Sequence, residues 1–120
     1  MPGGKSGLYP GIKTEGPEYD KRNAQAYAIY KIELEREAQD KKWGFPQRNT
    51  YCEWSSILTE EVGELAKELN ELNFSLGDRA RMRAEAVQVA AVAISILTHD
   101  SLGAIEEVMA DLRAAPPKKL

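Results

Sequence analysis

The stretch "ILTEEVGELAKEL", residues 57–69, decides the fold class of this chain. Its apolar residues recur at intervals of three and four, which is the spacing of an amphipathic helix. On a wheel of about 100° per residue, Glu61 falls near the middle of the apolar stripe. Three more carboxylates accompany it, with Glu68 beside the stripe, Glu64 at its margin and Glu60 toward water. A buried carboxylate is costly unless it is paired, hydrogen-bonded or metal-bound. A solvated acidic edge near Lys67 explains this helix alone equally well.

The stretch "AEAVQVAAVAISIL", residues 84–97, favours the first interpretation. It predicts a helix over about 79–98 that is apolar on nearly every side and is therefore buried on most sides. The polar residues of this helix share one stripe, which contains Arg81, Glu85, Gln88, Ser95 and His99. The short turn at 74–78 predicts that it lies antiparallel to the helix at about 53–73. The facing stripes then bring Glu61, Glu64 and Glu85 together, where a hard divalent cation such as Mg²⁺ relieves their repulsion.

The remaining chain predicts an all-α fold, a helical bundle of about four helices with an extended N-terminal arm. Residues 18–44 read as a long helix that Asp20 caps and that Gly44 and Pro46 stop. A short last helix, about 102–114, starts after Asp100 or Ser101. The predicted parts are a Gly- and Pro-rich arm at 1–18, a helical domain at 19–114 and a tail at 115–120.

Composition limits the partners and the compartment. The net charge of −3 argues against binding to a nucleic-acid polymer, because such proteins usually carry a basic patch. The only cysteine, Cys52, cannot form an internal disulfide. The N-terminus has no apolar segment of signal-peptide length, and the longest apolar run, at 89–94, is too short to span a bilayer. We therefore expect a cytoplasmic protein without a membrane partner.

The two helical stretches resemble the motif helices of the MazG-like group of all-α NTP pyrophosphohydrolases. The resemblance covers about residues 33–99 and includes "EREAQDKKWG" at 35–44. It implies Mg²⁺, with Mn²⁺ as an alternative ion, bound by Glu61, Glu64 and Glu85. Glu60 completes the EExxE motif, and the resemblance implies that it can assist the metal or the attacking water. Gln88 stands where the family's ExxD motif has aspartate, so this metal position offers only a neutral carbonyl oxygen.

The resemblance also implies an activity, the conversion of a (d)NTP into a (d)NMP and pyrophosphate. Glu60 and Glu61 are then the catalytic candidates. Candidate substrate-binding residues are Lys67 and Arg81 for phosphates, and Trp43, Tyr51 and Trp54 for the base. Solvated surface charge explains each basic residue equally well, and His99 and Trp54 have structural alternatives, a helix-end contact and core packing. The other functional hypotheses are a non-catalytic nucleotide- or metal-binding module and a purely structural oligomer. A homodimer or homotetramer is expected in each case.

Overall fold

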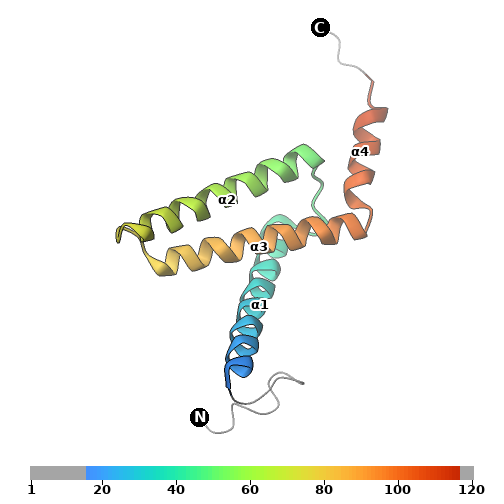
Figure 1. The fold of residues 1–120 in the computed structure, drawn as a ribbon. Coiled ribbons are helices and arrows are strands. Elements are labelled where there is room, and N and C mark those ends of the chain that lie inside the picture. Colours follow the sequence, from blue (N-terminus) through green and yellow to red (C-terminus); the bar gives the residue numbers. More distant parts are fainter. Residues whose placement is uncertain (1–15, 117–120) are drawn as a thin grey trace.

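The computed structural model describes residues 16–116, which contain four helices and no strand. These are α1 (Gly16–Trp43), α2 (Tyr51–Asn73), α3 (Arg79–Ser101) and α4 (Ala104–Ala114). Figure 1 shows α2 and α3 running side by side in opposite directions, while α1 crosses α3 and α4 turns away from the pair. The predicted all-α fold is confirmed. The predicted N-terminal arm lies outside the described residues, except that residues 16–18 already belong to α1.

Helices α2 and α3, which carry the carboxylates, each begin at a residue whose side chain caps the helix. The Thr50 side chain accepts from the backbone N–H of Glu53 at 3.1 Å, and the Glu53 carboxylate accepts from the N–H of Thr50 at 2.8 Å. This capping box starts α2 at Tyr51, two residues earlier than predicted. Asp78 caps α3, as predicted, by accepting from the N–H of Ala80 at 2.7 Å. The caps fix where each carboxylate falls around its helix.

Two other predicted caps are wrong. Helix α1 starts at Gly16, so Asp20 lies inside the helix rather than at its end. Pro17 suits the first turn because its missing N–H has no helical partner there. Helix α3 continues to Ser101, and the N-cap of α4 is Gly103, whose φ of +72° favours glycine.

The core is small and lies where α2, α3 and α4 meet. Trp54, Val92 and Ile105 are buried together. The expectation that α3 is buried on most sides is wrong for the single chain. Its buried residues are only Ala91, Val92, Ser95 and His99, and Leu97 is 67% exposed. Helix α1 buries no residue at all. Neighbouring helices therefore cover only part of the apolar surface.

The apolar character of α3 also bears on membranes. Within residues 16–116, no single helix combines the length and composition needed to cross a bilayer. Helices α3 and α4 meet those criteria only as a pair that is bent by 69°.

Candidate functional site

A groove of about 690 Å³ lies among α1, α2, α3 and the loop between α1 and α2. Six residues singled out from the sequence line it, namely Trp43, Trp54, Glu60, Glu61, Glu85 and Gln88. Part of the predicted polar stripe of α3 faces it, since Ser95 lines it beside Glu85 and Gln88, whereas Arg81 and His99 do not. Glu60 also lines the groove, although the helical wheel placed it toward water, and it remains exposed. Part of the polar stripe of α3 thus meets Glu60 and Glu61 of α2 in one groove.

Glu61 and Glu85 form the centre of the acidic part of the groove. They come from the two antiparallel helices α2 and α3, and both line the same groove. The pKa of Glu61 is raised above 4.5, first by burial and then by the neighbouring carboxyl group of Glu85. The negative charges of Glu85, Glu60 and Glu64 raise it further. Glu61 therefore keeps its proton to a higher pH than an isolated carboxyl group does, and a cation can replace that proton.

Four predicted site residues lie outside the groove lining. Glu64 is exposed and acts on Glu61 through its charge. Lys67 is exposed on α2. Arg81 points its Nε at the buried carboxylate of Glu68, 3.4 Å away. The hydroxyl of Tyr51 donates to Glu106 of α4.

Five polar residues that the sequence reasoning missed line the same groove. Glu35, Gln39 and Lys42 come from α1, and Gln47 and Asn49 from the following loop. The three α1 residues recur at steps of four and three, which indicates a common face of the helix. That spacing could have suggested a polar stripe on α1, but nothing in it indicates that the stripe crosses α3. The ammonium group of Lys42 lies 4.8 Å from the centre of the Trp43 ring.

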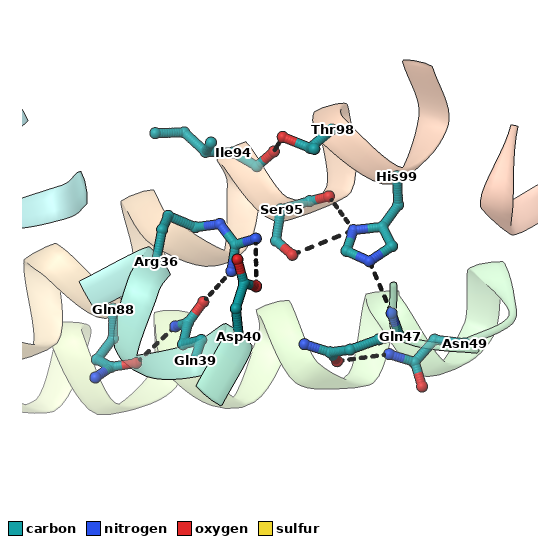
Figure 2. A network of polar contacts seen from close by, with 10 residues as sticks. All are labelled: Arg36, Gln39, Asp40, Gln47, Asn49, Gln88, Ile94, Ser95, Thr98 and His99. Atoms are coloured by element: carbon teal, nitrogen blue, oxygen red, sulfur yellow. Dashed lines mark hydrogen bonds and ion pairs between the residues drawn. The ribbon is translucent and has the colours of Figure 1, made fainter. Parts of the chain in front are cut away.

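His99 forms a hydrogen bond with the loop between α1 and α2, which carries Gln47 and Asn49. Its Nδ1 lies 2.7 Å from the carbonyl oxygen of Ser95, and its Nε2 accepts from the backbone N–H of Gln47 at 3.0 Å (Figure 2). Because the Gln47 N–H can only donate, Nε2 must be the unprotonated nitrogen and Nδ1 the donor. The ring is fully buried, with the rings of Phe45 and Trp54 about 5 Å away. His99 thus contacts its own helix, as expected, and also the α1–α2 loop.

The donor chemistry of the groove suits a hard cation. Glu61 and Glu85 offer carboxylate oxygens, and Glu60 lies on the same wall. Mg²⁺ in proteins is commonly held by one or two carboxylates together with substrate phosphates. Within residues 16–116, no group of three His, Cys, Asp or Glu side chains is close enough to hold a metal ion. Two carboxylates are too few to hold a Mg²⁺ ion alone, so an ion here would need further oxygen ligands, such as those of a phosphate.

No protein-family model, curated protein or solved structure matches this chain. The resemblance to MazG-like enzymes therefore stays a prediction, and it rests on residues of α1, α2 and α3.

Proposed function

We propose that this protein is a Mg²⁺-dependent nucleoside triphosphate pyrophosphohydrolase. It converts a (d)NTP into a (d)NMP and pyrophosphate and removes unwanted nucleotides from cytoplasmic pools. The observation that carries the proposal is that Glu61 and Glu85, on the antiparallel helices α2 and α3, line one groove. The pair lies in a groove of about 690 Å³, within the range typical of small-molecule sites.

Some groove residues would act on the phosphates of a nucleotide, and another would contact its base. Glu61 and Glu85 would hold Mg²⁺, which neutralises phosphate charge and lowers the pKa of a bound water when present. Glu60 is exposed on the same wall and accepts the proton of the attacking water. Lys42 lines the groove and supplies positive charge there, whereas Lys67 and Arg81 lie outside it. Trp43 is 63% exposed and offers an aromatic face to the base.

A second candidate function is a non-catalytic nucleotide- or metal-binding oligomeric module. Two observations favour it. Among the described residues no third carboxylate completes a metal site with Glu61 and Glu85. The side-chain oxygen of Gln88, at the fourth motif position, already accepts a hydrogen bond from Gln39.

Pyrophosphate release from a panel of (d)NTPs, with Mg²⁺ or with excess chelator, separates the two functions. We expect release that requires Mg²⁺ and disappears in Glu61→Gln and in Glu85→Gln. Glu33→Gln is the matched control, because Glu33 is exposed on α1 and does not line the groove. Nucleotide binding without pyrophosphate release would instead support the non-catalytic module. Turnover in excess chelator would exclude the metal role of the glutamate pair.

A further inference from the structure

A chain of side-chain hydrogen bonds runs from α1 to Gln88 of α3 (Figure 2). Arg36 donates through Nη2 to the carboxylate of Asp40 at 2.9 Å and through Nη1 to Oε1 of Gln39 at 2.9 Å. Gln39 then donates through Nε2 to Oε1 of Gln88 at 3.2 Å. The Arg36 side chain is only 11% exposed, so this chain begins at a largely buried cation.

The chemistry of Arg36 fixes which way both amides face. A guanidinium has only donors, so the atom of Gln39 that meets it must be the oxygen. The nitrogen of Gln39 is then the end directed at Gln88, and an N–H can only meet the Gln88 oxygen. Between residues 16 and 116, no group accepts from the remaining amide nitrogen of Gln88. The two amides are therefore ordered by the charge of Arg36.

This order favours a donor role for Gln88 over a metal-ligand role. Its oxygen is the only atom of the amide that binds a cation, and one of the two lone pairs of that oxygen already accepts from Gln39. The free end of the group is the NH₂, which attracts oxygen anions and repels cations. Gln88 lines the groove that Glu61 and Glu85 line. An aspartate at this position would add a third negative charge, whereas Gln88 adds a donor.

We propose that Gln88 is a hydrogen-bond donor to an anionic ligand in the groove, namely the phosphoryl oxygens of a nucleotide or pyrophosphate, and is not a metal ligand. The identity of the anion rests on the proposed function. The orientation of the donor rests only on the bonds from Arg36 through Gln39. Arg36 and Gln39 are positioning residues, because they act on the ligand through Gln88.

Two titrations of the full chain by calorimetry test the assignment. One uses Mg²⁺ alone, and the other uses pyrophosphate at saturating Mg²⁺. Gln88→Met keeps the length of the side chain and removes both polar ends. We expect its Mg²⁺ affinity to stay within about twofold of wild type and its pyrophosphate affinity to fall about tenfold or more, the usual loss for a hydrogen bond to a charged group. Gln25→Met, at an exposed position on α1, is the control for a Gln→Met change. A fall in Mg²⁺ affinity, or unchanged pyrophosphate affinity, would overturn the proposal.

Nuclear magnetic resonance of the wild-type protein gives a readout that needs no variant to fold. We expect pyrophosphate with Mg²⁺ to shift the side-chain NH₂ signal of Gln88, and Mg²⁺ alone to leave it in place. The reverse pattern would identify Gln88 as a metal ligand. This readout also separates the two proposals. A shifted Gln88 NH₂ without turnover of any (d)NTP supports the donor and contradicts the enzyme. Turnover of a (d)NTP, together with a Gln88 NH₂ signal that does not shift with pyrophosphate, supports the proposed enzyme activity and contradicts the proposed donor role of Gln88.

Discussion

The backbone N–H of Gln47 donates to Nε2 of His99 across 3.0 Å, and this contact joins the α1–α2 loop to the buried end of α3. The loop in turn supplies Gln47 and Asn49 to the groove, where the Asn49 amide donates to the Gln47 side chain at 3.1 Å. His99 can hold the loop only as the neutral tautomer, because an imidazolium has no acceptor.

Two substitutions of His99 separate this contact from simple packing. A glutamine oxygen can replace Nε2, whereas an asparagine is too short to reach Gln47. We expect His99→Asn to lower the free energy of unfolding by about 1–3 kcal/mol more than His99→Gln, the usual cost of a buried polar group without a partner. Hydrogen exchange at the Gln47 amide should accelerate in His99→Asn and stay slow in His99→Gln. Equal exchange in the two variants would show that the bond does not hold the loop.

The raised pKa of Glu61 predicts how stability depends on pH without metal. A carboxyl group whose folded-state pKa lies above the unfolded value of 4.5 stabilises the fold fully below pH 4.5, and this contribution is lost as the pH rises through the folded pKa. Glu61→Gln has no proton to lose at this position, so raising the pH through that window should destabilise wild type more than the variant. The denaturant midpoint of the variant, measured relative to that of wild type, should therefore be higher at pH 7 than at pH 4. Glu33→Gln should show no such change, and a parallel pH profile for Glu61→Gln would contradict the prediction.

Gly77 allows the tight turn between α2 and α3. A Cβ at this position would lie 2.9 Å from both the backbone nitrogen and the Cγ of Leu72. Because the backbone nitrogen cannot move freely, we expect Gly77→Ala to lower the free energy of unfolding by about 1–3 kcal/mol. A Cβ added to Gly63, in the middle of α2, would meet no atom within 4 Å. We therefore expect Gly63→Ala to raise the free energy of unfolding by about 0.5–1 kcal/mol. Urea denaturation of both variants checks the contrast, and equal effects would show that the turn relaxes around the new methyl group.

The exposed apolar surface predicts a homo-oligomer. Tyr27 and Leu34 of α1 line a groove of about 680 Å³ together with Met82 and Val87 of α3. Lys31, Glu35 and Arg83 on its walls carry both signs of charge, which suits a second copy of the same surface. We expect sedimentation to give a multiple of 13.4 kDa and Leu34→Glu to reduce it. Leu76→Glu, in the exposed turn after α2, should leave the mass unchanged. A monomeric wild-type chain would contradict the oligomer.

The local parts of the site were predictable and the long-range parts were not. Helical periodicity placed Glu61 and Glu85 on facing stripes, and the short turn before Asp78 made their helices antiparallel. The same periodicity placed Glu60 toward water, and Glu60 is exposed, but a wheel could not show that it also lines the groove, because a wheel contains no information about the third helix that closes the groove. The crossing of α1 over α3, which brings Gln39 to Gln88, depends on tertiary packing at a separation of 49 residues. The hydrogen bond that orients the Gln88 amide therefore could not be predicted from the sequence.

The last prediction concerns Gln88→Asp, which restores the residue type that the MazG-like motif has at this position. Without metal, the new carboxylate joins the groove of Glu61 and Glu85 and loses the hydrogen bond from Gln39 that the longer side chain accepts. Both effects should lower the melting temperature. With Mg²⁺ the added carboxylate can bind the cation directly, and a ligand that binds only the folded state stabilises it by about 2.7 kcal/mol at a hundredfold excess over Kd. Thermal melts across a Mg²⁺ titration should therefore show a larger metal-induced rise for Gln88→Asp than for wild type. A rise no larger than that of wild type would mean that position 88 does not face the cation, whichever residue occupies it.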